Sequence, residues 1–64
     1  MKFTRKELDV IDTIHEAEEE LIYHFPGDYK AKQHFLQWRR DKVKDLPAHV
    51  RKYVLSRDPN IHAL

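Results

Sequence analysis

The sequence contains no cysteine, one glycine (Gly27) and three prolines among its 64 residues. The lack of cysteine excludes a disulfide scaffold, a thiolate nucleophile and a zinc site with sulfur ligands. One glycine cannot build a glycine-rich phosphate-binding loop. Ser56 is the only serine, so hydroxyl nucleophiles are scarce as well. We therefore expect a protein that is not an enzyme and that binds no cofactor.

Long hydrophobic runs are also absent. No apolar stretch approaches the ~18 residues that a membrane span requires, and residues 1–7 hold no apolar segment of signal-peptide length. The 12 Lys and Arg nearly balance the 11 Asp and Glu, which gives a net charge of +1. A chain this short supports one modest core. These features predict a single cytoplasmic domain over residues 1–64 that has no membrane partner.

Helix-forming residues dominate, and no stretch alternates apolar and polar residues with a period of two, so the sequence predicts an all-α fold. Proline and glycine divide the chain into helices at about residues 5–24, 29–44 and 47–57, followed by a tail at 58–64. The two-residue break at Pro26-Gly27 makes the first two helices antiparallel neighbours. The expected architecture is an antiparallel hairpin with a shorter third helix, which is a small three-helix bundle. The tail has two alternatives, packing of Ile61 or Leu64 on the bundle or fraying.

The first helix has a well-defined start. Thr4 and Glu7 have the spacing of a capping box, in which each side chain binds the other residue's backbone N–H. Phe3 and Leu8 occupy the positions of a hydrophobic staple around this cap. Two independent signals therefore place the beginning of the helix at about Arg5.

Each predicted helix has one apolar side, which predicts the core. The first helix contributes Leu8, Val10, Ile11, Ile14, Ala17, Leu21, Ile22 and Phe25. The second contributes Ala31, Phe35, Leu36, Trp38 and Val43, and the third contributes Leu46, Val50, Tyr53 and Val54.

Glu18 is the exception on the apolar side of the first helix. An unpaired carboxylate there would carry a desolvation cost of several kcal/mol. In an antiparallel hairpin, Arg39 lies about one turn from the level of Glu18. We expect a structural ion pair between Glu18 and Arg39 that sets the register of the helices, with Lys42 as the substitute donor.

The two halves of the chain carry opposite charges. Residues 1–28 hold 3 basic and 8 acidic side chains (−5), and residues 29–64 hold 9 basic and 3 acidic ones (+6), which sum to +1. Pairing between an acidic and a basic helix within the hairpin is one explanation. Binding of an external partner is the other.

The preferred functional hypothesis is a small regulator or adaptor that acts by protein–protein interaction. Its predicted contacts form an outward acidic stripe with one tyrosine: Asp12, Glu16, Glu19, Glu20 and Tyr23. Exposed tyrosines frequently anchor protein interfaces. A homodimer also fits, because small domains gain stability by association.

The alternative hypothesis is a nucleic-acid-binding regulator. The second and third helices, joined by a short link, would form a unit that resembles a helix-turn-helix. Its predicted contacts are Arg39, Arg40, Lys44, His49, Arg51, Lys52 and Arg57. The absence of Asn and Gln from the third helix leaves no side chain for adenine readout, which favours the protein-binding hypothesis.

Metal binding has weak support. His15 with Glu19 and Glu20 with His24 are pairs at i, i+4 that could each supply two ligands, but a site needs ligands from another helix. His34 is the nearest candidate, and on the helical wheel it faces away from the first helix. We expect no metal site.

Overall fold

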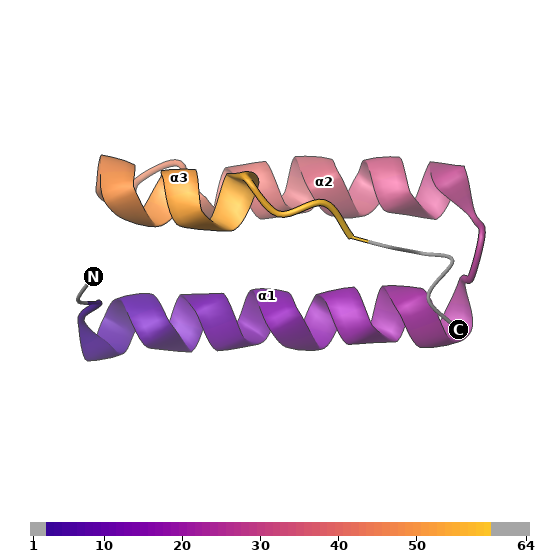
Figure 1. The fold of residues 1–64 in the computed structure, drawn as a ribbon, viewed down its shortest axis with the longest axis horizontal. Coiled ribbons are helices and arrows are strands. Elements are labelled where there is room, and N and C mark those ends of the chain that lie inside the picture. Colours follow the sequence, from indigo (N-terminus) through magenta and orange to yellow (C-terminus); the bar gives the residue numbers. More distant parts are fainter. Residues whose placement is uncertain (1–2, 60–64) are drawn as a thin grey trace.

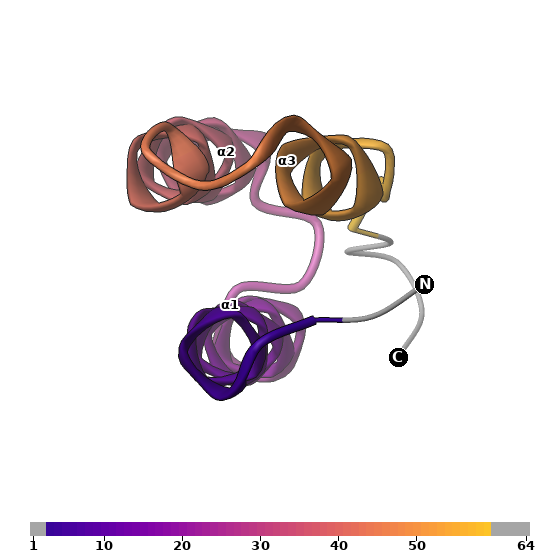
Figure 2. The same cartoon turned by 90° about the vertical axis from the view of Figure 1, so that its left-hand side faces the viewer.

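The computed structural model describes residues 3–59, which form three helices: α1 (Arg5–His24), α2 (Tyr29–Val43) and α3 (Ala48–Leu55). Helices α1 and α2 form an antiparallel hairpin, and α3 returns beside α2 (Figures 1 and 2). The predicted all-α class and the small three-helix bundle are confirmed. Ile61 and Leu64, on which the predicted alternatives for the tail depend, lie outside the described residues.

Helix α1 begins with the predicted capping box. The Thr4 hydroxyl accepts a hydrogen bond from the Glu7 N–H at 3.1 Å, and the Glu7 carboxylate accepts one from the Thr4 N–H at 2.8 Å. Glu7 is only 8% exposed. The box therefore satisfies two backbone donors that the first turn of a helix otherwise leaves without partners.

Phe3 packs against α3 at this end of α1. Its ring lies 5.9 Å from that of His49 and 5.2 Å from that of Tyr53, measured between centroids. Leu8 is 45% exposed, so its predicted place on the buried side of α1 is wrong. Leu8 lies at the edge of the apolar arc of α1, and only the centre of that arc faces α2 and α3.

The turn of the hairpin depends on Gly27. Its φ of 76° is the only positive value among residues 3–59, and glycine adopts this conformation without a steric penalty. The Asp28 N–H donates to the Phe25 carbonyl at 3.1 Å, which closes the turn. The Asp28 carboxylate then accepts the Ala31 N–H at 3.0 Å and caps α2.

The third helix is shorter than the sequence predicted, spanning 48–55 rather than 47–57. Pro47 has an extended ψ of 153° and precedes the helix as its N-cap. Its carbonyl accepts the N–H groups of Val50 and Arg51 at 3.0 and 3.1 Å. Helix α2 likewise ends at Val43, one residue before the predicted boundary.

The buried core consists of apolar residues that the helical pattern predicted. Its members are Ile11, Ile14, Leu21, Phe35, Val43, Val50 and Val54. Helix α3 does not extend to the end of the hairpin near the α1–α2 turn (Figure 1). Phe25 lies at that end and is 51% exposed, although its position on the wheel predicted burial.

The capping box yields a stability prediction. Thr4→Ala removes the acceptor for the Glu7 N–H and is expected to lower the free energy of unfolding by about 1 kcal/mol. Urea denaturation monitored by circular dichroism measures this change.

Thr13→Ala is the matched control. The Thr13 hydroxyl is exposed and donates to the Asp9 carbonyl at 2.9 Å within the helix. Such back-bonding adds little to helix stability, and alanine has the higher helix propensity. Equal destabilisation by both substitutions would contradict a specific contribution from the capping box.

Candidate protein-interaction face

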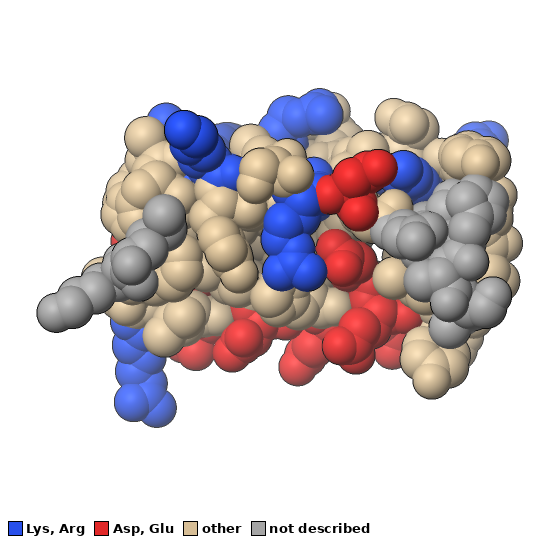
Figure 3. Space-filling view, in the orientation of Figure 1, with Lys and Arg blue, Asp and Glu red and all other residues tan. Residues whose placement is uncertain are grey.

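The surface charge follows the division of the sequence into an acidic and a basic half. Carboxylates gather along α1, and most Lys and Arg side chains lie over α2 and α3 (Figure 3). Arg5 and Lys6, at the start of α1, belong to the acidic half of the sequence and are exposed cations. The three-dimensional structure therefore keeps the two charges on different sides of the molecule.

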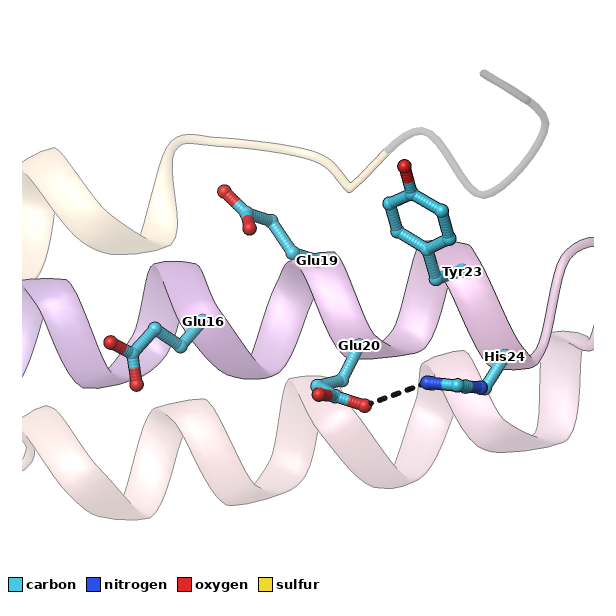
Figure 4. A pocket seen from close by; sticks show the side chains of 5 residues that line it. All are labelled: Glu16, Glu19, Glu20, Tyr23 and His24. Carbon is cyan, nitrogen blue, oxygen red and sulfur yellow. Dashed lines mark ion pairs between the residues drawn. The ribbon is translucent and has the colours of Figure 1, made fainter.

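The predicted interaction residues lie together on the outer side of α1. Glu16, Glu19, Glu20 and Tyr23 line one shallow depression with His24 (Figure 4). Asp12 is exposed one turn before Glu16. We call Asp12, Glu16, Glu19, Glu20 and Tyr23 the acidic face.

Tyr23 is the aromatic member of the acidic face and is 72% exposed. Figure 4 shows Tyr23 and Glu19 on one edge of the helix, with Glu20 and His24 on the other. The His24 ring nitrogen Nε2 lies 3.1 Å from the Glu20 carboxylate. The tyrosine ring therefore projects from a surface whose neighbouring side chains are mainly carboxylates.

Charge pairing within the bundle does not account for the acidic face. Two ion pairs are present among residues 3–59: Glu20 with His24 inside α1, and Lys32 with Asp58 at 3.1 Å. Neither joins an α1 carboxylate to a Lys or Arg of α2 or α3. The opposite charges of the two halves thus remain on the surface.

The predicted ion pair between Glu18 and Arg39 is not among these contacts. The Arg39 guanidinium instead donates to the Arg57 carbonyl at 2.8 Å, and Arg39 is 5% exposed. Lys42, the predicted substitute, places its ammonium 5.6 Å from the centre of the Trp38 ring.

Glu18 nevertheless influences the pKa of Arg39, because both residues line the same small cavity. Burial lowers the pKa of Arg39 below its ordinary value, and the Glu18 and Asp58 carboxylates act in the opposite direction. Glu18 therefore stabilises the buried cation through its field rather than by direct contact.

The basic residues of the alternative hypothesis do not form one continuous exposed set. Arg39 is buried, which corrects its predicted role in binding phosphate. Arg51 is half-buried and donates to the Leu46 carbonyl, and the Arg57 guanidinium lies 2.9 Å from the His15 ring nitrogen Nε2. Arg57 is nevertheless exposed, as are the other predicted residues of this set: Arg40, Lys44, His49 and Lys52.

The arrangement of α2 and α3 also differs from a helix-turn-helix. That motif joins its helices at about 90–120°, whereas α3 runs back beside α2 in both views (Figures 1 and 2). A helix in this position lies flat on the bundle and does not project as a recognition helix does.

His34 is placed differently from the expectation. It lines a groove between α1 and α2 together with Glu20, so the prediction that it faces away from α1 is wrong. Within residues 3–59, no three His, Asp or Glu side chains come together as metal ligands would.

No known protein family, curated protein sequence or solved structure matches this chain. None of the helices within residues 3–59 has both the length and the hydrophobicity needed to cross a lipid bilayer. Any assignment of function therefore depends on the surfaces described above.

The environment of Arg39 yields a second stability prediction. Glu18→Gln removes the carboxylate that most favours the charged form of the buried Arg39 guanidinium. It is expected to lower the free energy of unfolding by about 1 kcal/mol. Glu19→Gln, at the adjacent exposed position, is expected to change it by less than about 0.5 kcal/mol. Thermal and urea denaturation of both variants make the comparison, and an unchanged Glu18→Gln protein would contradict the role given to Glu18.

Proposed function

We propose that this chain is a small, non-enzymatic regulatory or adaptor protein that binds a basic surface of another protein through the acidic face of α1. The partner would place Lys or Arg side chains against Glu16, Glu19 and Glu20, and an apolar surface against the Tyr23 ring. Charged rims around an aromatic anchor are typical of protein interfaces.

The surface carboxylates of α1 are the observation that carries this proposal. Apart from the buried Glu7 and the half-buried Glu18, the α1 carboxylates are exposed, and among the described residues none forms an ion pair with α2 or α3; Glu20 pairs with His24 inside α1. Like charges at i, i+4, such as Asp12, Glu16 and Glu20, destabilise a helix slightly. A basic partner would relieve this repulsion, and the bundle itself does not.

Nucleic-acid binding by the basic half is the alternative, and it rests on the exposed Arg40, Lys44, Lys52 and Arg57. Four cations are few for a phosphate-contacting surface, because each contact adds only one released counterion to the affinity. The orientation of α3 beside α2 adds no support for recognition of a DNA groove by α3. These features favour the protein-binding proposal.

Site-specific photo-crosslinking tests the acidic face. A photoreactive phenylalanine analogue at position 23 is expected to capture a partner from the lysate of the source cells, whereas the same analogue at the exposed Gln33 of α2 is not. With the captured protein purified, Tyr23→Ala is expected to weaken binding more than about tenfold, as for an interface hot spot. Equal capture from both positions, or unchanged affinity of Tyr23→Ala, would contradict the proposal.

Fluorescence anisotropy with a labelled random-sequence duplex tests the alternative. At about 50 mM salt the protein is expected to leave the anisotropy unchanged, since sequence-independent binding depends on counterion release and is strongest at low salt. Binding that falls steeply as salt rises, and that is lost when Arg40, Lys44 and Lys52 are all changed to Gln, would support nucleic acid as the ligand instead.

A further inference from the structure

A small cavity lies where the three helices and the chain after α3 meet. Its polar lining consists of His15, Glu18, Arg39 and Arg57, and the remaining lining side chains are apolar or aromatic. Two of the polar groups satisfy each other, because the Arg57 guanidinium has only donors and the His15 Nε2 atom accepts from it at 2.9 Å. The hydrogen bonds of Arg39 and Glu18 remain to be explained.

Arg39 contributes a buried donor to this cavity. Its Nη1 atom donates to the Arg57 carbonyl at 2.8 Å, but its Nε–H is fully buried and meets no acceptor within residues 3–59. Arginine keeps its protons in proteins, so this N–H cannot avoid the need for an acceptor by losing its proton. Buried donors in native proteins are almost always hydrogen-bonded, either to protein or to an ordered water.

Glu18 contributes an acceptor to the same cavity. The side chain is half-buried, and within residues 3–59 its carboxylate forms neither an ion pair nor a hydrogen bond. Its negative charge nevertheless raises the pKa of Arg39 against the larger effect of burial, so the carboxylate lies close enough to influence the guanidinium. A charged donor and a charged acceptor therefore line one cavity without direct contact.

The size and charge of the cavity determine which molecule can join the two groups. Its volume is about 10 Å³, at the lower end of the roughly 10–15 Å³ that one buried water requires. Glu18 repels an anion, and Arg39 and Arg57 repel a cation. A neutral water fits both groups, because its oxygen accepts from the Arg39 Nε–H while one of its hydrogens is donated to the carboxylate.

We propose that this cavity binds one water, which bridges the Arg39 Nε–H and the Glu18 carboxylate. The two side chains then form a water-mediated pair between α2 and α1, in place of the direct ion pair that the sequence predicted. The water completes the hydrogen bonding of the buried guanidinium and holds the two helices in register. This inference concerns the interior of the bundle and does not rest on the proposed function.

Nuclear magnetic resonance tests for the water directly. In a rotating-frame experiment, a dipolar peak between water and an N–H has the opposite sign from a peak caused by hydrogen exchange. The wild-type protein is expected to show a dipolar peak at the Arg39 Nε–H, whereas the exposed Arg40 of the same helix is expected to show exchange alone. The absence of a dipolar peak at Arg39 would overturn the proposal, as would a crystal structure in which the Glu18 carboxylate binds Nε directly.

Two substitutions of Glu18 separate a bridging water from an effect of charge alone. Glu18→Gln and Glu18→Leu both remove the charge, but only Gln keeps an oxygen that can accept from the water. Glu18→Leu is expected to lower the folding equilibrium constant about tenfold more than Glu18→Gln does, because the buried Nε–H loses its bridge. Urea denaturation measures both constants.

The chemistry of leucine makes this comparison strict. Leucine has at least the helix propensity of glutamine, and position 18 lines the cavity beside Ile11 and Ile14. If Glu18 acted through its charge alone, Glu18→Leu would therefore be at least as stable as Glu18→Gln. That result would overturn the proposal.

Discussion

One buried guanidinium connects the three helices of this small bundle. Arg39 belongs to α2, lies over the ring of Phe35 at 5.7 Å, and donates to the carbonyl of Arg57, just beyond α3. The Glu18 carboxylate of α1 lines the same small cavity and favours the charged form of Arg39, whose Nε–H is buried without a hydrogen-bond partner among the described residues. Removing a cation from water costs several kcal/mol unless polar groups replace the lost hydration. Arg39 thus ties the chain after α3 to α2, and the Arg57 guanidinium, 2.9 Å from the His15 ring nitrogen Nε2, brings the same segment next to α1.

The charged side chains of the bundle fall into two groups: those that bind another segment of the chain and those that remain on the surface. Arg39 and Arg51 donate to backbone carbonyls, and Lys32 binds Asp58 beside the end of α3. The carboxylates on the outer side of α1 contact no cation of another helix among residues 3–59. Arg39 and Arg51 of the basic half thus bind backbone carbonyls inside the bundle, whereas the α1 carboxylates other than Glu7 and Glu18 are exposed.

The features that the sequence predicted well depend on neighbouring residues. The capping box of Thr4 and Glu7 and the turn at Gly27 follow from spacings of a few positions, and the core valines of α2 and α3 follow from helical periodicity. The acidic face was predictable for the same reason, because i, i+4 spacing places its members on one side of a helix.

The features that the sequence did not predict depend on contacts between segments that are far apart in the chain. The partner of Arg39 is a backbone carbonyl 18 residues away, and no side-chain pattern indicates such an acceptor. Phe25 is 51% exposed although it continues the apolar side of α1, and it lines a groove between α1 and α2. Ala17, Leu21 and Phe25 at intervals of four were the available signal, but that spacing indicates a core as readily as a docking surface.

The division of charge gives this nearly neutral molecule a large electric dipole. Its negative end lies on α1 and its positive end on α2 and α3, so the dipole points across the bundle rather than along the helices (Figure 3). In the field of a charged partner such a molecule rotates before contact, which raises the rate of productive encounters. Counterions shorten the range of this field to about 8 Å at physiological ionic strength. Association kinetics should therefore slow as salt increases, even though the net charge is only +1.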